Sequence, residues 1–206
     1  MTIEPPITYL ITSGELTQEN FTSRSDEFVR LLAEAAIDGL DVIQIREKAL
    51  SARNLSVLSS RLSDELHDSR TKLLVNDRAD IAKAAGCDGV HLTTRSLSVE
   101  AVRKIVGTEA VISCSTHTVD EVKRASDAGA DIILFGTVFA SPGKGEAVGL
   151  DALVEAVHAA GESKLLALGG INERNFTEAL DRGADGVAAI RSLNDRASRR
   201  VIIGGR

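Results

Sequence analysis

The chain has 206 residues, 43% of them hydrophobic and 26% charged, with a formal net charge of −6 and two cysteines. This length and composition predict one domain, residues 1–206, around a single core. The negative charge argues against nucleic acid as the main partner, and no apolar stretch is long enough for a signal peptide or a membrane span. We therefore expect a cytoplasmic protein without a membrane partner, in which Cys87 and Cys114 are reduced, buried thiols.

Short apolar runs, typical of buried strands, alternate along the chain with segments of helical periodicity. In chain order, strand-like runs cover 7–12, 41–48, 73–77, 110–115 and 164–170, with three more directly after residues 88, 131 and 185. Helical periodicity covers 25–37, 51–67, 98–106, 118–126, 150–159 and 174–181. Candidate N-caps of these helices are Ser51, Ser98, Thr118 and Asn172.

One short pattern recurs four times. It consists of a glycine, one further residue, an aspartate and then an apolar run, and its glycines are Gly39, Gly86, Gly129 and Gly183. Glycine is favoured where a helix ends, because the left-handed conformation costs it no Cβ clash. The spacing of about 43 to 54 residues is too long for one strand–helix unit and suits two.

Eight strands alternating with helices predict an all-parallel α/β protein, and eight units in 206 residues fit a single closed (β/α)8 TIM barrel. An open doubly wound sheet is the alternative, although "LITSGELTQ" is a poor version of the glycine-rich turn that such a sheet usually has after its first strand. The residues after the eighth strand, "DRASRRVIIGGR", are expected to form only a shortened final helix.

The active site of this barrel type lies at the C-terminal ends of the strands, where polar residues gather in this sequence. In "DVIQIREK" (41–48) alternation places Gln44, Arg46 and Lys48 on the inward face, and Lys144 from a glycine-containing loop could join them around a polyanion. Gly169-Gly170 after the seventh strand, with Ile190-Arg191 after the eighth, occupies the usual phosphate cradle of the fold.

A metal site and two histidines complete the candidates. Asp77, at the end of the third strand, is a candidate ligand for Mg²⁺ bridging to a diphosphate, since this ion uses few protein carboxylates. His91 and His117 lie at strand ends, where a hydrogen-bonded structural role is at least as common as direct chemistry. We expect small phosphorylated molecules as partners and leave assembly into a homo-oligomer open.

Several of these segments together resemble the thiamin phosphate synthase and thiazole tautomerase superfamily. They are "QIREK" (44–48), "VNDRADIAKAAGCDGVHL" (75–92), "ISCSTHTVDEVKRASDAGADIILFG" (112–136), "KGEAVGLDAL" (144–153) and "LALGGINERN" (166–175). The resemblance extends from about residue 7 to residue 192 and implies a (β/α)8 barrel. It also implies a transferase of thiamin biosynthesis that joins hydroxymethylpyrimidine diphosphate to thiazole phosphate and releases pyrophosphate.

The resemblance also implies roles for particular residues. Gln44 would contact the pyrimidine, Asp77 would hold Mg²⁺, and Ser115 would contact the leaving pyrophosphate. Gly170 would bind the thiazole phosphate together with the backbone near Ile190 and Arg191. The diphosphate would be bound by Arg46, Lys48, Asn76 and Lys144; Ser141 would assist at the thiazole phosphate, and the catalytic candidates are Ser115, Lys144 and Arg46.

Two positions depart from the family pattern. Ser96 stands where the synthases have a second aspartate for Mg²⁺, and a hydroxyl is a far poorer ligand for this ion. Thr137 stands where the tautomerase branch has a histidine, and threonine cannot act as a general acid or base near neutral pH. Three hypotheses therefore stay open: a synthase, a tautomerase-like isomerase of thiazole phosphate, and a non-catalytic protein that binds thiamin phosphates.

Overall fold

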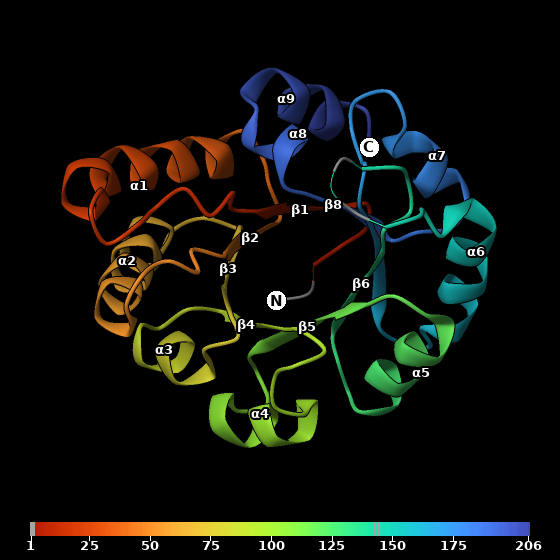
Figure 1. The fold of residues 1–206 in the computed structure, drawn as a ribbon, viewed down its shortest axis with the longest axis horizontal. Helices are drawn as coiled ribbons and strands as arrows, with labels where there is room; N and C mark the ends of the chain where they lie inside the picture. Colours follow the sequence, from red (N-terminus) through yellow and green to blue (C-terminus); the bar gives the residue numbers. More distant parts are fainter. Residues whose placement is uncertain (1–2, 142, 144) are drawn as a thin grey trace.

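In the computed structural model, which describes residues 3–141, 143 and 145–206, eight parallel strands close into a barrel in the order of the sequence. Figure 1 shows the helices arranged around this ring. The closed barrel confirms the (β/α)8 prediction and rules out the open sheet, because β1 pairs with β8 from Ile7–Gly186 onward. The strands are β1 Ile7–Ile11, β2 Val42–Ile45, β3 Lys72–Asn76, β4 Gly89–Leu92, β5 Val111–Thr116, β6 Ile132–Gly136, β7 Lys164–Leu168 and β8 Gly186–Ala189.

The helices agree with the periodicity at most positions, and α2, α4, α5 and α9 begin after a residue whose side chain caps them. The N-caps Ser51, Ser98 and Thr118 are confirmed, since each side chain accepts a hydrogen bond from the amide three residues on. The Asn172 prediction is wrong, because that helix begins after Asn175. The helices are α1 Phe21–Ile37, α2 Ala52–Glu65, α3 Ala79–Ala84, α4 Val99–Val106, α5 Val119–Asp127, α6 Gly149–Ala159, α7 Phe176–Asp181, α8 Arg191–Asn194 and α9 Arg196–Gly204.

The final helix, α9, is short as expected, with nine residues against the 17 of α1. It is nevertheless a true closing helix. Asp195 caps its N-terminus by accepting from the amide of Ser198 at 2.8 Å, and Ile202 is fully buried. Its contacts with α1, described below, complete the ring.

Two apolar cores follow from the alternation of side chains along each strand. One core lies between the strands and the surrounding helices, and it contains residues such as Ile43, Val75 and Leu165. The other fills the inside of the barrel and is made mainly by Ile7, Tyr9, Ile11, Val42, Leu74, Ile132, Leu134, Leu166 and Ala188. The polar residues at the C-terminal strand ends therefore lie above a barrel interior that is mainly apolar.

The recurring glycine–aspartate pattern has one structural role in all four copies. Each glycine has a positive φ, from 69° at Gly86 to 103° at Gly39, which is the helix-ending conformation that the pattern predicts. Each aspartate carboxylate accepts a hydrogen bond from an amide at or near the start of the preceding strand. The pairs are Asp41 with Thr8 at 2.8 Å, Asp88 with Leu73 at 2.9 Å, Asp131 with Ile112 at 2.7 Å and Asp185 with Leu165 at 2.9 Å.

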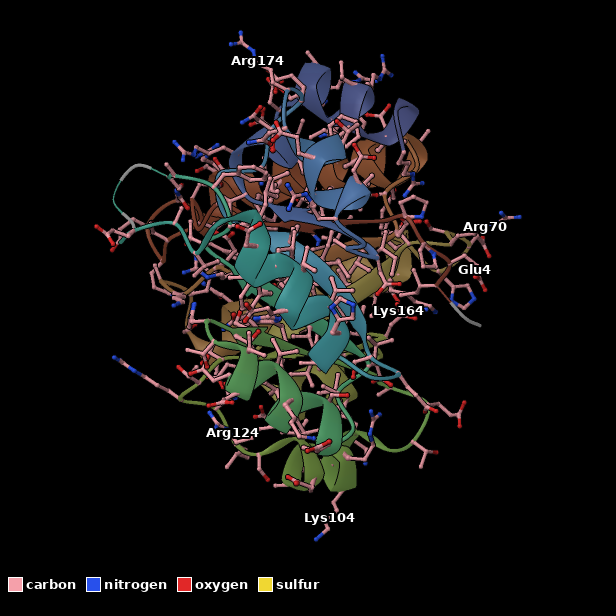
Figure 2. All side chains as sticks on the ribbon, turned by 90° about the vertical axis from the view of Figure 1, so that its right-hand side faces the viewer. Glu4, Arg70, Lys104, Arg124, Lys164 and Arg174 are labelled. Atoms are coloured by element: carbon pink, nitrogen blue, oxygen red, sulfur yellow. The ribbon has the colours of Figure 1, made fainter. Side chains whose placement is uncertain are left out.

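The two ends of the barrel are therefore distinct. Figure 2 places Glu4, Arg70 and Lys164, which precede or begin strands β1, β3 and β7, toward one end of the molecule, and the loops that follow the strands lie at the other end. We call this other end the mouth. Among the described residues, none of the helices is long and apolar enough to cross a membrane.

Candidate functional site at the barrel mouth

Three of the predicted site residues, Gln44, Arg46 and Lys48, lie in β2 or directly after it. Strand β2 stops at Ile45, so the predicted eight-residue stretch is strand over Val42–Ile45 only. Gln44 points inward and is 1% exposed, as alternation predicts. Arg46 follows the strand with a half-buried side chain, and its backbone amide donates to Thr12 Oγ1 at 2.8 Å. Lys48 is exposed in the turn beyond.

Glu47, between the two cations, is not a surface charge. It is 3% exposed, and its carboxylate accepts hydrogen bonds from the amides of Gly14 at 3.0 Å and Leu16 at 2.7 Å. A charged group is buried at this level only when it is paired or hydrogen-bonded. Glu47 therefore fixes the loop after β1 against the end of β2 and holds the backbone that carries Arg46 and Lys48.

Gln44 and Asn76 form a polar pair on the floor of the mouth. Gln44 Nε2 donates to Asn76 Oδ1 at 2.9 Å across the β2–β3 ladder. Gln44 Oε1 is buried and accepts no hydrogen bond from any described residue. A buried acceptor without a donor is costly, so Gln44 Oε1 is a candidate acceptor for an N–H group of a ligand.

Asp77 is the carboxylate nearest to this pair in sequence. Its backbone has φ of 64° and its amide donates to the carbonyl of His91 at 2.8 Å, which holds an exposed side chain at the end of β3. Among the described residues, no three His, Cys, Asp or Glu side chains gather as a metal site would require. A single carboxylate fits a magnesium ion that takes its remaining ligands from water and from substrate phosphates.

His91 lies on β4 inside the barrel and joins a line of hydroxyl groups. Its Nδ1 lies 2.7 Å from Ser113 Oγ, and its Nε2 lies 2.8 Å from Ser115 Oγ at the mouth. Ser113 Oγ in turn lies 2.9 Å from the phenol oxygen of Tyr9, which is fully buried. Burial, and after it the charge of Arg46, lowers the pKa of His91 to about 3, whereas burial raises the pKa of Tyr9. Both side chains are therefore neutral near pH 7.

The glycines after β7 have positive φ values of 96° at Gly169 and 67° at Gly170. A Cβ at Gly169 would lie 2.6 Å from Thr137 Cγ2, and one at Gly170 would lie 2.6 Å from the carbonyl oxygen of Phe139. The close approach of the loop after β6 thus requires both glycines, independently of any ligand. Asn172 and Asn175 both donate to the Gly170 carbonyl, at 3.0 and 3.1 Å, and fix the turn.

The loop after β8 faces the loop after β6. Arg191 Nη2 donates to Ser141 Oγ at 3.0 Å, so two of the predicted phosphate-binding residues are in direct contact. Ile190 precedes α8 and is half-buried, and the exposed Arg191 begins that helix. Lys144, predicted to join the diphosphate cluster, lies outside the described residues.

The positions that depart from the family pattern both have local partners. Ser96 Oγ accepts from the Thr93 amide at 2.8 Å and lies 3.1 Å from Thr93 Oγ1, so it closes the turn after β4. The Thr137 side chain stands against Gly169. His117 at the end of β5 is exposed, and its Nδ1 lies 2.5 Å from the carbonyl oxygen of Gly136.

Sequence reasoning missed three residues of this site: Tyr9, Ser113 and Glu47. Tyr9 falls on an inward-facing position of the apolar strand β1, and Ser113 lies two residues before Ser115 on the same side of β5; these positions are the signal that could have found them. In the sequence, Glu47 continues the alternation of the buried Ile43 and Ile45, and a carboxylate in that register needs donors.

Comparison with known proteins identifies the family of the chain. The model of the family described as thiamine monophosphate synthase matches residues 8–193. The chain belongs to this family. The thiamine-phosphate synthase of Haloarcula marismortui is 39% identical over 191 residues, which cover 90% of this chain and 87% of that protein. The thiamine-phosphate synthase of Moorella thermoacetica is 36% identical, over 80% of each chain.

Solved structures agree with the family assignment. The thiamine phosphate pyrophosphorylase from Pyrococcus furiosus matches with a TM-score of 0.81 and 27% identity, covering 96% of this chain and 94% of that one. A structure of 3-hexulose-6-phosphate synthase matches with a TM-score of 0.69 at 16% identity, which shows the shared barrel alone. The predicted site residues described above lie at the barrel mouth, which is the end where enzymes of the (β/α)8 fold carry their active sites.

Proposed function

We propose that this protein is a thiamine-phosphate synthase, a transferase that couples hydroxymethylpyrimidine diphosphate to thiazole phosphate and releases pyrophosphate. The observation that carries the proposal is the pair formed by Gln44 and Asn76, with Gln44 Oε1 buried and lacking a donor among the described residues. The amino group of the pyrimidine is the kind of donor that this acceptor needs. The relatives named as synthases support the same activity.

The reaction breaks the bond between the pyrimidine's exocyclic carbon and the diphosphate oxygen, and the electron pair leaves with the diphosphate. The thiazole nitrogen then forms a new bond to that carbon. Negative charge grows on the departing diphosphate, so preorganised donors at that point lower the barrier. We assign this role to Arg46, Ser115 and Lys48, with Lys144 as a further cation; Asn76 would add an amide donor.

Asp77 is the residue that we assign to Mg²⁺, together with oxygens of the bound diphosphate. The ion would neutralise charge on the leaving group. At the other side of the mouth we assign the thiazole phosphate to Ser141, Arg191 and the backbone of Gly169, Gly170 and Ile190. The contact between Arg191 and Ser141 supports a site in which both side chains converge. A cytoplasmic location fits this activity and stays a proposal.

No observation favours the isomerase alternative, because Thr137 offers no proton-transferring group at the position where that branch uses a histidine. A coupling assay distinguishes the synthase from the non-catalytic alternative. Purified protein with Mg²⁺ and both substrates should form thiamin phosphate and pyrophosphate in equal amounts. Binding of both substrates without product would support the non-catalytic hypothesis instead.

Substitution of Arg46 tests the diphosphate assignment. Arg46→Ala should weaken pyrophosphate binding by about one to two decades, because one charge-assisted contact contributes about 1.5–3 kcal/mol. Arg61→Ala is the matched control. It removes the same charge, but Arg61 pairs with Asp26 on the outer helices and not at the mouth. Calorimetry that gives both variants the wild-type affinity would contradict the assignment of Arg46.

A further inference from the structure

Four inward-facing side chains form one line of hydrogen bonds from the barrel centre to the mouth, which we call the hydroxyl relay. It runs from Tyr9 to Ser113, on to His91 and then to Ser115, over distances of 2.9, 2.7 and 2.8 Å between the bonded atoms. Tyr9 and Ser113 are 0% exposed and His91 is 2% exposed, whereas Ser115 is half-buried at the mouth. The relay thus connects buried groups in the barrel interior with Ser115 at the mouth.

The number of protons in the relay constrains their direction. Tyr9, Ser113 and Ser115 each bring one hydroxyl proton, and a neutral imidazole brings one N–H proton. Three hydrogen bonds join these groups, so one proton is left without an acceptor inside the relay. Its position depends on the direction in which the bonds run.

In the inward direction, Ser115 donates to His91 Nε2, His91 Nδ1 donates to Ser113, and Ser113 donates to Tyr9. The unused proton is then on the Tyr9 phenol, which is fully buried. The one other contact of that oxygen among the described residues is His91 Nδ1 at 3.5 Å, which already carries a proton in this direction. In a mixed arrangement, the hydrogen bonds do not all run the same way along the relay. Such an arrangement also leaves a buried hydroxyl proton, on Ser113 or Tyr9, without an acceptor.

In the outward direction, Tyr9 donates to Ser113, Ser113 donates to His91 Nδ1, and His91 Nε2–H donates to Ser115. The unused proton is then on Ser115, where a ligand or water can accept it. This direction is the one that leaves no buried proton in the relay without an acceptor, and unpaired buried donors are disfavoured.

We propose that His91 is a positioning residue which, as the Nε2–H tautomer, occupies the acceptor side of Ser115 and turns the Ser115 hydroxyl proton toward the departing diphosphate. The kinetic part of this inference rests on the proposed synthase function. His91 transfers no proton and touches no substrate atom. Its effect is to make Ser115 a hydrogen-bond donor before the carbon–oxygen bond breaks, when negative charge grows on the diphosphate.

Double substitution separates this role from a structural one. Ser115→Ala should lower kcat about 10- to 100-fold, and His91→Leu should lower it about tenfold or more, with the KM for the diphosphate little changed. His91→Leu added to Ser115→Ala should cause no further loss, because the hydroxyl that it orients is already absent. His91→Gln retains a terminal N–H and should recover most of the wild-type kcat.

Thr116→Val is the matched control for loss of a buried hydroxyl on the same strand. Thr116 is 3% exposed, donates to the Leu134 carbonyl at 3.3 Å and lies outside the relay, so its kcat should equal that of the wild type. If His91→Leu lowers kcat by the same factor with and without Ser115, then His91 does not act through Ser115, and the inference is overturned.

The tautomer can be measured without any assay of activity. In nitrogen-15 NMR spectra of the whole protein at pH 7, the signal that disappears in His91→Gln should show a protonated Nε2 and an unprotonated Nδ1. A protonated Nδ1, alone or with Nε2, would overturn the outward direction even if the protein is an active synthase. If the wild type forms no thiamin phosphate, the proposed function fails, whereas the tautomer remains a separate result.

Discussion

The Ser96 hydroxyl accepts a hydrogen bond from the Thr93 amide at 2.8 Å and closes the turn that follows β4. A carboxylate at this position would add a second acidic group to a mouth where Asp77 is the proposed metal ligand. With Asp77 alone, we expect Mg²⁺ to bind weakly until the substrate diphosphate supplies further oxygens. We therefore expect residue 96 to influence how much free Mg²⁺ the proposed reaction requires.

Ser96→Asp should lower the Mg²⁺ concentration for half-maximal coupling, by roughly three- to tenfold, because one carboxylate oxygen replaces a water ligand. The measurement is the coupling rate against Mg²⁺ at saturating substrates. Ser98→Asp is the matched control, since it adds the same charge two residues away at an N-cap where aspartate is favoured. An equal shift in both variants would assign the effect to general charge and not to a metal ligand.

Alternation along "DVIQIREK" predicts the inward position of Gln44 because the β2 strand is regular through that residue. It does not fix Arg46 and Lys48, since the strand ends at Ile45 and the direction of later side chains depends on the turn. That turn is held by three hydrogen bonds to the loop after β1: the Arg46 amide donates one and the Glu47 carboxylate accepts two. Such contacts between distant segments leave no periodic signal in the sequence.

At the scale of elements, the turn after β7 and the loop after β6 fit against each other with no room for a side chain. Gly170 combines a φ of 67° with carbonyl oxygens of Phe139 and Ala140 at 2.6 and 2.7 Å from any added Cβ. Both neighbours are backbone atoms, so they cannot move aside without moving the loop. The geometry of the proposed thiazole phosphate site therefore depends on the packing between these two loops.

Gly170→Ala should destabilise the fold by about 2 kcal/mol or more, through the left-handed backbone and the clash together. Gly129→Ala is the matched control, because its φ of 86° is similar but a Cβ there meets nothing within 4 Å; it should cost about 1 kcal/mol. Urea unfolding of the wild type and of both variants measures the loss in the free energy of unfolding. Equal losses would show that the loops separate easily and that the clash has no cost.

The four glycine–aspartate repeats show what a pattern predicts and what it omits. The glycines were predictable as helix ends, because each stands between a helical segment and an apolar run and glycine adopts the positive φ of a helix end without a Cβ clash. The partners of the aspartate carboxylates were not predictable. Each carboxylate accepts a hydrogen bond from a strand amide more than a dozen residues earlier, such as Asp131 from Ile112. Sequence spacing alone does not show which strands become neighbours until the barrel closes.

At the scale of the whole molecule, an ion-pair cluster joins the last helix, α9, to the end of the first helix, α1. Asp38 at the end of α1 accepts from Arg199 at 2.8 Å, and both side chains are almost fully buried, while Arg196 and Arg200 approach the same carboxylate from the surface. Burial opposes ionisation of Asp38, but hydrogen bonds and charge from Arg199 and Arg200 outweigh it, so the pKa of Asp38 lies below its ordinary value.

This cluster should make stability depend on pH in the acidic range. Since the folded pKa of Asp38 lies below the unfolded pKa of about 3.9, its contribution is complete above about pH 4 and is lost as pH falls through the folded value. Asp38→Asn should cost about 2–3 kcal/mol at pH 7, and the difference from wild type should shrink below pH 4. Urea unfolding at pH 7 and pH 3 measures both quantities.

Asp26→Asn is the control for this prediction, because Asp26 pairs with Arg61 while its side chain is 87% exposed. Exposed pairs of this kind contribute between about 0 and 1 kcal/mol, so little change is expected at either pH. A destabilisation by Asp38→Asn that stays constant from pH 7 to pH 3 would contradict the assignment to the ionised carboxylate.

The pairing of β1 with β8 has a consequence for synthesis on the ribosome. The first strand of the barrel emerges early, yet one of its edges finds its partner only after the other six strands and β8 have been made. During that interval the nascent chain carries an apolar strand, "ITYLI", with an unsatisfied parallel edge. Long-range pairing of this kind is slow and exposed to aggregation. We therefore expect the nascent chain to be most prone to aggregation while the residues between β1 and β8 are being synthesised.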